Sequence, residues 1–136
     1  MKKNKVVHMT SVHNPFDVRI FHKECKSLYK AGFNVSLVAQ HDKDEVVDGI
    51  KILSVPKAKN RFCRMVKTTW QVFRRAVKEK ASVYHFHDPE LIPLGLLLKL
   101  LGKKVIYDIH EDYVTSIKIK EYLSKIFNLL LKLVIN

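Results

Sequence analysis

The most constraining feature of this 136-residue sequence is the alternation of short apolar runs with longer amphipathic runs. The short runs have the length of strands, and most of the runs between them have helical spacing. This alternation is typical of βα units that build a parallel sheet. The predicted strands span residues 5–9, 33–39, 49–55, 81–86 and 104–109. We expect an α/β domain with a Rossmann-like, doubly wound parallel sheet, in which the first, fourth and fifth strands are neighbours.

Helix start and stop signals divide the intervening runs. Asp17 is a predicted N-cap, and the helix that follows it ends at Gly32. Asp88 and Pro89 are predicted as the N-cap and first residue of a helix over residues 90–101, which is apolar nearly all round and is expected to be buried. A polar link spans residues 41–48, and a last amphipathic segment runs from about residue 117 to the end.

Composition limits the classes of protein that remain. Apolar residues make up 47% of the chain, which is enough for a core and excludes a disordered chain. Cys25 and Cys63 both fall inside predicted helices, which favours a reduced, cytosolic setting. The first apolar run is too short for a signal peptide, and the longest ones fall short of a membrane span. We expect a single domain over residues 1–136.

The charge is concentrated in one segment. Residues 57–80 contain nine Lys or Arg and one acid, and so carry +8 of the formal charge of +12. Phe62, Met65, Val66, Thr69, Val72, Phe73 and Ala76 fall on one helical stripe. Because Trp70, Phe62 and Phe73 have core spacing, the segment favours an anionic membrane surface over nucleic acid, although a polyanion-binding module stays open. The predicted membrane-facing residues are Arg61, Arg64, Lys67, Arg74, Arg75 and Lys78.

Polar residues follow three predicted strands, in residues 10–13, 85–88 and 108–112. If these strands are neighbours, their carboxyl ends build one pocket of imidazoles, carboxylates and hydroxyls beside helix N-termini that favour anions. His8 lies within the first strand and is interpreted as a core histidine with a satisfied hydrogen bond. The candidate substrate-binding residues are Ser11, His13, Asn14, Asp17, Arg19, His87, Asp88, Glu111 and Asp112, with His110 as the candidate catalytic residue.

Two other chemistries were weighed. The cluster of His85, His87, Asp88 and His110 has the ligand types of zinc or iron, so a metal-dependent hydrolase is an alternative. Pro89 directly after Asp88 suits capping better than coordination, and no metal is assigned. The turn after the first strand contains no glycine, which makes a dinucleotide cofactor improbable.

Four strings taken together resemble the N-terminal half of a family 4 glycosyltransferase. They are residues 10–21 (TSVHNPFDVRIF), 28–35 (LYKAGFNV), 85–91 (HFHDPEL) and 107–112 (YDIHED). The resemblance covers essentially the whole chain, and it is specific as a set. It implies a retaining, nucleotide-sugar-dependent enzyme of the GT-B fold, in which two Rossmann-like domains face each other across a cleft.

The resemblance implies that this chain is the acceptor-side domain, and that the nucleotide-sugar binds mainly a C-terminal domain absent from it. His110 resembles the family's histidine at the sugar-transfer centre, and residues 11–17 match a glycine-containing loop near the diphosphate. His13, Asn14 and Pro15 replace the glycine pair of many members, so Arg19 and Lys23 become candidates for the phosphate contact. His87 or Asp88 would orient the acceptor.

The implied function is transfer of a sugar to a glycan or lipid-linked acceptor in polysaccharide or cell-envelope biosynthesis. The resemblance implies no cofactor or metal in this domain, and the isolated domain is expected to be inactive. Its expected partners are the C-terminal domain, the acceptor and an anionic membrane surface. The expected location is the cytoplasm, peripherally on the inner face of the cytoplasmic membrane.

Overall fold

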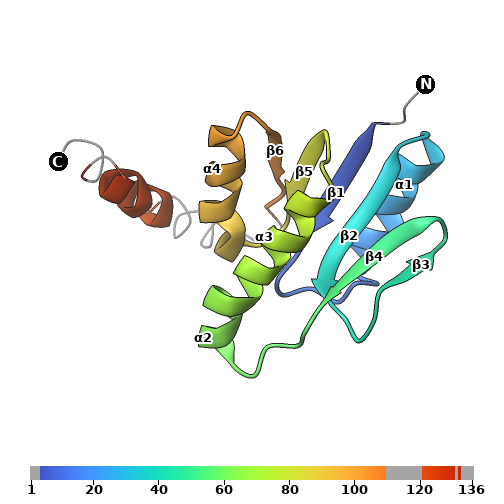
Figure 1. Ribbon diagram of the computed structural model, residues 1–136, viewed down its shortest axis with the longest axis horizontal. Coiled ribbons are helices and arrows are strands. Elements are labelled where there is room, and N and C mark those ends of the chain that lie inside the picture. Colours follow the sequence, from blue (N-terminus) through green and yellow to red (C-terminus); the bar gives the residue numbers. More distant parts are fainter. Residues whose placement is uncertain (1–3, 110–120, 131, 133–136) are drawn as a thin grey trace.

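The computed structural model describes residues 4–109, 121–130 and 132, and its centre is a six-stranded sheet (Figure 1). The strands are β1 (Lys5–Met9), β2 (Asn34–Gln40), β3 (Glu45–Val47), β4 (Ile50–Val55), β5 (Val83–Phe86) and β6 (Lys104–Tyr107). Their order in the sheet is β3-β4-β2-β1-β5-β6. The predicted neighbours are therefore confirmed. The polar link over residues 41–48 additionally contains β3, which pairs antiparallel with β4 at the edge.

Parallel pairing holds β1 between β2 and β5. His8 lies opposite Leu37 of β2 on one side and opposite His85 of β5 on the other. β5 in turn pairs in parallel with β6, so that His85 also lies opposite Ile106. The carboxyl ends of β1, β5 and β6 are consequently adjacent.

Helices cover both faces of the sheet, as a doubly wound fold requires. They are η1 (Val18–Cys25), α1 (Lys26–Lys30), α2 (Arg61–Cys63), η2 (Arg64–Thr68), α3 (Thr69–Lys78), η3 (Pro89–Leu91) and α4 (Ile92–Leu100). The segment η1 is a π-helix that continues directly into α1, and α2, η2 and α3 follow one another in the same way. Figure 1 shows α3 and α4 on one side of the sheet and α1 on the other.

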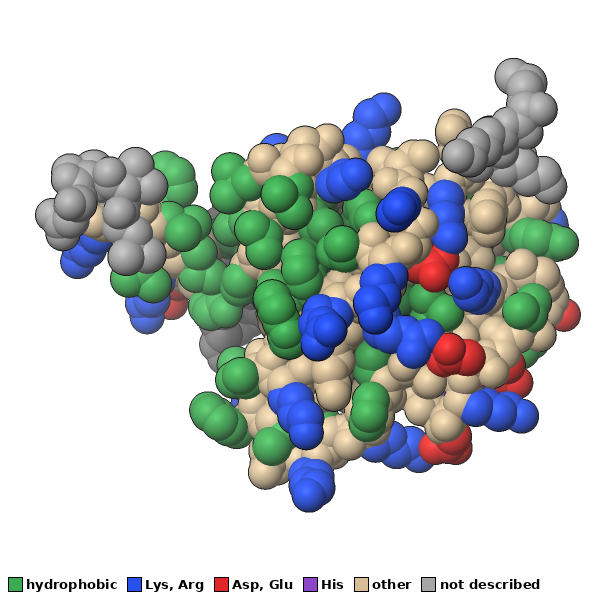
Figure 2. Space-filling model, in the orientation of Figure 1, with side chains coloured by type: hydrophobic (Ala, Val, Ile, Leu, Met, Phe, Trp, Pro, Cys, Tyr) green, Lys and Arg blue, Asp and Glu red, His purple; other side chains and the backbone are tan. Residues whose placement is uncertain are grey.

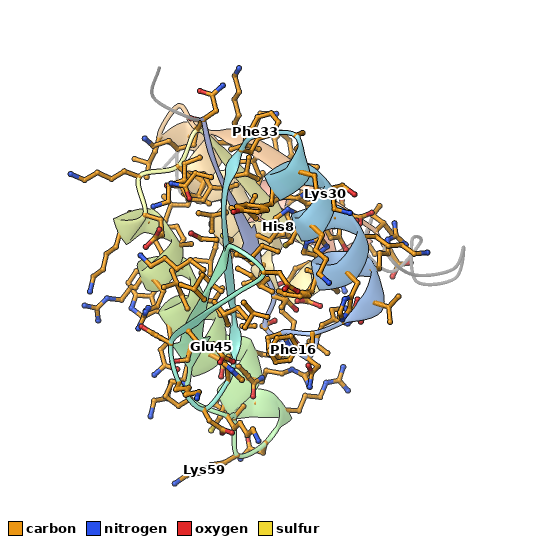
Figure 3. The ribbon with its side chains drawn as sticks, turned by 90° about the vertical axis from the view of Figure 1, so that its right-hand side faces the viewer. His8, Phe16, Lys30, Phe33, Glu45 and Lys59 are labelled. Carbon is orange, nitrogen blue, oxygen red and sulfur yellow. The ribbon has the colours of Figure 1, made fainter. Side chains whose placement is uncertain are left out.

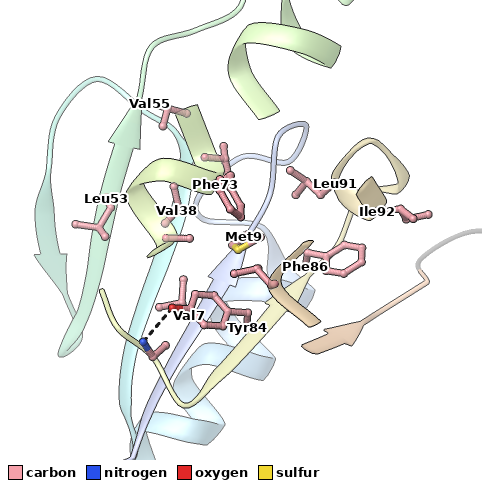
Figure 4. Close-up of a cluster of buried hydrophobic side chains, with 14 residues drawn as sticks. Val7, Met9, Val38, Leu53, Val55, Phe73, Tyr84, Phe86, Leu91 and Ile92 are labelled. Carbon is pink, nitrogen blue, oxygen red and sulfur yellow. Dashed lines mark hydrogen bonds between the residues drawn. The ribbon is translucent and has the colours of Figure 1, made fainter. Parts of the chain in front are cut away.

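The larger core lies between the sheet and the pair α3 and α4 (Figure 4). Alternate residues of β1 and β5 point into it, because side chains alternate between the faces of a strand. Val7 and Met9 come from β1, and Tyr84 and Phe86 come from β5. The Tyr84 hydroxyl accepts a hydrogen bond from the Ala81 backbone N–H at 3.2 Å, which satisfies its polar end.

The smaller core lies on the opposite face, against η1. Ile20, Phe21 and Cys25 of η1 pack on β2 and β4. By the same alternation, His8 and His85 point to this face, next to the part of the sheet that β1 and β5 supply. The sequence places two imidazoles where a strand buried on both faces would normally carry aliphatic side chains.

Two predicted apolar surfaces are more exposed than expected. The stripe on the basic helix is buried in α3, at Thr69, Val72, Phe73 and Ala76, but Phe62 is 75% exposed and Met65, Val66 and Trp70 are also exposed. Thr68 of η2 is buried and Arg64 is half-buried, so the exposed apolar side chains lie on the outer side of the α2–η2 end of the helix. The helix α4 was expected to be buried all round, but only its inner face is, and Leu100 is 79% exposed. Hydrophobic side chains gather over α4 in Figure 2.

Residues 121–130 form a helix within the predicted C-terminal segment, and Phe127 and Leu129 of this helix are exposed. Leu123 packs against the larger core. Within the part of the chain that the structure describes, no helix combines the length and apolar composition that a membrane span needs.

Gly95 is where α4 approaches β5 most closely. A Cβ at this position would lie 2.5 Å from Cε1 of the Phe86 ring, which itself stacks on Tyr107. We expect Gly95→Ala to lower the free energy of unfolding by about 1–2 kcal/mol, because the forced repacking outweighs the helix propensity that alanine gains. Urea unfolding of both proteins measures this difference.

The control is Leu100→Ala on the exposed side of the same helix, which should change stability by no more than about 0.5 kcal/mol. Adding Phe86→Leu to Gly95→Ala should relieve the clash and give a favourable coupling between the two sites. A Gly95→Ala protein as stable as the original would contradict this account of the contact.

Candidate functional site

The candidate site is the edge of the sheet at which β1, β5 and β6 end. The loop of residues 10–16 leaves β1 here, residues 87 and 88 leave β5, and Asp108 follows β6. Two backbone hydrogen bonds carry the pairing beyond the strands, from the His87 N–H to the Met9 carbonyl and from the Asp108 N–H to the Phe86 carbonyl. The three polar strand exits of the sequence are therefore joined at one edge.

The buried carboxylate of Asp88 organises the loop. One oxygen, Oδ2, accepts hydrogen bonds from the Thr10 hydroxyl at 2.6 Å and from the Ser11 backbone N–H at 2.8 Å. The other, Oδ1, lies 3.2 Å from Nε2 of His13. The position of Asp88 before the helix is as predicted, but its side chain makes no capping bond to the helix and binds the neighbouring loop instead.

The surroundings of Asp88 favour its charged form. Burial raises the pKa of the carboxyl, but hydrogen bonds from His13, Thr10 and the Ser11 N–H outweigh burial and hold the pKa below its ordinary value of 3.8. Asp88 is thus a buried anion that three donors stabilise.

A second acid, Glu90, connects the loop to the basic helix. Its carboxylate accepts bidentate hydrogen bonds from the Arg64 guanidinium, the shortest of them 2.7 Å. It also accepts a hydrogen bond from the Ser11 hydroxyl at 3.0 Å. Gln40, at the end of β2, donates to the Ser11 carbonyl at 2.6 Å. A guanidinium in a bidentate pair holds its partner in a fixed geometry. Arg64 therefore fixes Glu90, and through Glu90 it helps to hold the loop.

Asp17 caps the first helical segment, as predicted. Its Oδ1 accepts hydrogen bonds from the backbone N–H groups of Arg19 and Ile20 at 2.9 and 3.1 Å. Because this carboxylate occupies the N–H groups of the first turn, they are not available to a phosphate. The Arg19 guanidinium, a predicted phosphate contact, donates to Asp108 at 2.8 Å instead.

Three histidine rings pack together directly behind this edge. His8 of β1 and His85 of β5 have ring centroids 4.6 Å apart, and His87 stacks on His85 at 4.5 Å. Nδ1 of His8 and Nε2 of His87 are hydrogen-bonded at 2.9 Å. Figure 3 shows His8 between the sheet and the first helical segment. The prediction that His8 is a buried, hydrogen-bonded histidine is confirmed for its Nδ1.

Glu24 and Asp108 border the histidines. Burial raises the pKa of Glu24 to about 7, and a hydrogen bond to Asp108 and the charge of Asp108 add to that effect. Burial and the neighbouring His85 lower the pKa of His8 to about 3, so its imidazole is neutral at pH 7. His8, Glu24, His85 and His87 offer ligand atoms that all lie within 4.8 Å of one another, which makes them the described group that could hold a metal ion.

The candidate substrate-binding residues divide by exposure. Asn14 and Arg19 are exposed, and His13 and Asp17 are half-buried at the surface. Ser11, His87 and Asp88 are buried and do not face solvent, His87 with only 2% of its surface accessible. Ser11 and Asp88 hold the loop, whereas His87 belongs to the group of histidines. His110, Glu111 and Asp112 lie outside the described residues.

The structure describes three members of the predicted metal-hydrolase cluster, His85, His87 and Asp88, and His110 lies outside the described residues. His85 and His87 lie together, but their companions are His8 and Glu24, while Asp88 binds the loop. Glu24, Gln40 and Glu90 were missed as site residues. Glu24 lay on a helix that otherwise had ordinary amphipathic spacing, and only its position near the predicted strand ends could have indicated its role.

The predicted membrane-facing residues are also of two kinds. Arg64 is paired with Glu90, and Arg75 is paired with Asp44 at 2.6 Å. Arg61, Lys67, Arg74 and Lys78 are exposed and form no ion pair with any other residue in the described ranges. Figure 2 shows Lys and Arg side chains distributed over this face of the molecule.

Replacing Asp88 by Asn should loosen the loop. The amide removes the charge that three donors stabilise, so we expect a loss of about 1–3 kcal/mol in the free energy of unfolding at pH 7. The folded-state pKa of Asp88 is lowered, so its contribution is present above pH 3.8 and is lost as the pH falls through the folded value. The difference between the two proteins should therefore shrink below that pH, as denaturant unfolding at several pH values would measure.

The matched control is Asp42→Asn, whose carboxylate is 82% exposed, and it should alter stability by no more than about 0.5 kcal/mol. Equal stability of Asp88→Asn and Asp42→Asn at pH 7 would show that the buried anion does not hold the loop.

Comparisons with known proteins give solved structures that share the fold of this chain and a family model that matches its sequence. The chain is similar in structure to sucrose-phosphate synthase from Thermosynechococcus elongatus, with a TM-score of 0.58 and 13% identity over 85% of this chain and 35% of the synthase. A structure of part of the same synthase matches with a TM-score of 0.58 and 16% identity, over 85% of this chain and 68% of that one.

A hydrogenase C-terminal domain from Pyrococcus furiosus matches with a TM-score of 0.55 and 15% identity, over 79% of this chain and 94% of that domain. At such identities these likenesses show the fold alone. No curated protein sequence matches the chain. The model of glycosyltransferase family 4 matches residues 18–135, and this chain therefore belongs to that family, with its sheet as a Rossmann-like unit of the GT-B fold.

Proposed function

We propose that this chain is the acceptor-side domain of a retaining glycosyltransferase, which transfers a sugar from a nucleotide-sugar to a glycan or lipid-linked acceptor in polysaccharide or cell-envelope biosynthesis. The nucleotide-sugar would bind mainly a C-terminal domain outside this chain. The observation that supports this proposal best is the joining of three polar strand exits at one edge, in a chain of family 4. In open α/β sheets, ligands bind at this edge.

The exposed polar groups of the loop suit an acceptor better than a diphosphate. His13 is held by Asp88 on one side, and its Nδ1 lies 3.8 Å from Asp17 on the other, so the imidazole has a fixed orientation. Asn14 uses its side-chain oxygen to accept from the Phe16 N–H at 2.8 Å, which turns the loop and leaves its amide group at the surface. Hydroxyl groups of a sugar are natural partners for such donors and acceptors.

The sugar-transfer reaction requires this domain mainly to orient the reacting groups. If the leaving diphosphate takes the acceptor proton, no nucleophile from the protein is required. Donors that face the developing charge then do most of the work, and they act best when they are already fixed in place. His110 would donate a hydrogen bond to the donor sugar. In the sequence His110 lies two residues after Asp108, which Arg19 holds at the same edge.

Attachment to an anionic membrane is part of the proposal. The end of the basic helix exposes Phe62, Met65, Val66 and Trp70. Arg61, Lys67 and Arg74 lie on the same helix and form no ion pair with a residue that the structure describes. A basic and apolar surface of this kind is typical of a helix that lies in the membrane interface. This surface would bring the acceptor-side edge to lipid-linked acceptors at the inner face of the cytoplasmic membrane.

His110→Ala tests the sugar-transfer proposal in an enzyme that joins this chain to its donor-binding domain. Loss of one donor to the transition state should lower the rate of transfer about 10²–10³-fold. Release of the nucleoside diphosphate in the presence of acceptor measures the rate, and circular dichroism checks the fold. The chain without the donor domain should show no transfer.

His22→Ala is the matched control, because His22 is exposed on η1 and should leave turnover unchanged. If His110→Ala and His22→Ala turned over equally fast, His110 would be removed from the transfer centre.

The membrane proposal predicts a loss of vesicle binding when Arg61, Lys67 and Arg74 are all replaced by Gln. At about 1 kcal/mol for each cation near an anionic surface, affinity for phosphatidylglycerol-containing vesicles should fall about 100-fold at low salt. Vesicle sedimentation measures the affinity, and Trp70 fluorescence should shift on binding only with the original chain.

A triple replacement of Lys30, Lys43 and Lys103 by Gln changes the net charge equally at exposed positions elsewhere and is the control. Equal weakening by the two triple variants would mean that overall charge, and not this surface, attracts the membrane.

A further inference from the structure

Four side chains from three elements converge on one point inside the molecule. His8 comes from β1, Glu24 from η1, His85 from β5, and His87 follows β5 directly. Their ligand atoms all lie within 4.8 Å of one another. The proposed sugar transfer uses none of these groups as a donor or acceptor, and packing alone would favour aliphatic side chains in the middle of a doubly covered sheet.

The distances among three of the four ligand atoms are compatible with a bound cation. Nδ1 of His8 lies 2.9 Å from Nε2 of His87 and 3.8 Å from Oε2 of Glu24, and the third side of this triangle, from Nε2 of His87 to Oε2 of Glu24, is 3.6 Å. In the plane of these three atoms, the equidistant point lies about 2.0 Å from each, and an ion slightly out of that plane toward a fourth ligand would still be close to the bond lengths of zinc to imidazole nitrogen and carboxylate oxygen.

Asp108 and Arg19, which lie next to the four candidate ligands, also support a bound cation. Oδ2 of Asp108 lies 3.8 Å from Nδ1 of His87, on the side of the ring away from the triangle. Arg19 in turn donates to Asp108 at 2.8 Å and lies 3.6 Å from Glu24. Histidines that bind a metal through one nitrogen commonly have a carboxylate near the other, which fixes the ring.

The cluster is accessible to a small ion. A pocket of about 550 Å³ opens beside it, and His8, Glu24 and His85 are among the residues that line this pocket. Its other walls are largely apolar, with Leu28, Phe33 and Ile106 among them. Lys23 also lines the pocket, and Glu24 is the one carboxylate among the described lining residues, so a metal ion that enters has this acid and the imidazoles as its ligands.

The ligand types select the metal. Three imidazole nitrogens and one carboxylate oxygen suit zinc, whereas magnesium and calcium require mostly oxygen ligands. Four protein ligands make a closed coordination sphere, which is typical of structural zinc sites. We propose that His8, Glu24, His85 and His87 bind one Zn²⁺ ion, which fastens the helical segment η1 to strands β1 and β5.

The test uses the 136-residue chain, purified without a histidine tag and dialysed against a chelator. Titration with Zn²⁺ should show one ion bound per chain, and the midpoint of thermal unfolding should rise as Zn²⁺ is added. Co²⁺ as a spectroscopic probe should give the intense visible absorption of a tetrahedral site. Binding of zinc is measured directly, so the result does not depend on whether the enzyme transfers sugar.

Two ligand variants and one variant of Asp108 make the test specific. Glu24→Gln and His85→Gln should each weaken Zn²⁺ binding more than 10-fold and abolish the tetrahedral Co²⁺ spectrum, with circular dichroism confirming that each variant is folded. Asp108→Asn should weaken binding about 10–100-fold while keeping the tetrahedral spectrum. His22→Gln, which alters an exposed histidine on the same segment as Glu24, should bind Zn²⁺ as tightly as the original chain.

Several results would overturn the proposal. One is the absence of Zn²⁺ binding by the folded original chain, and another is binding of Co²⁺ with only the weak absorption of octahedral coordination. Equal affinities of the original chain, Glu24→Gln and His85→Gln would place any bound zinc elsewhere, as would a loss of binding in His22→Gln.

Discussion

Parallel pairing of β1 with β2 on one side and β5 on the other determines where the polar groups of this molecule lie. The register puts His8 opposite His85 and brings the residues after Met9 beside those after Phe86. One network of hydrogen bonds then extends from Asp88 through the loop to Glu90 and Arg64. A single strand alignment thus sets the positions of the loop, the histidine cluster and the start of α4. The helices on both faces of the sheet hold that alignment in place.

Most of the sheet could be predicted from the sequence, because strand order follows from connections that the βα pattern limits strongly. The N-cap role of Asp17 was predictable for a similar reason, since capping depends on residues only two or three positions away. The antiparallel strand β3 could not be predicted. Its short sequence, Glu45–Val47, alternates weakly and becomes a strand only because β4 offers a free edge.

The site was less predictable, because its contacts join residues far apart in the chain. Asp88 had the sequence signature of a cap, and only the neighbouring β1 loop explains why its carboxylate turns to Thr10 and Ser11. Nothing in the sequence distinguishes Arg64 from the other cations of the basic helix. Its ion pair with Glu90 becomes visible only in the structure. Helical periodicity also could not reveal that Phe62 and its neighbours lie exposed on the outer side of the helix.

The π-helical geometry of η1 bears on how such a cluster can arise. Ile20 and Cys25 are five residues apart, and the wider turn lets both face the core while Glu24 points towards the histidines. In an ordinary α-helix, five steps of about 100° would turn Cys25 about 140° away from Ile20, so the two side chains could not share one core. The wider turn is therefore what allows one short segment to face an apolar core and a group of imidazoles at the same time.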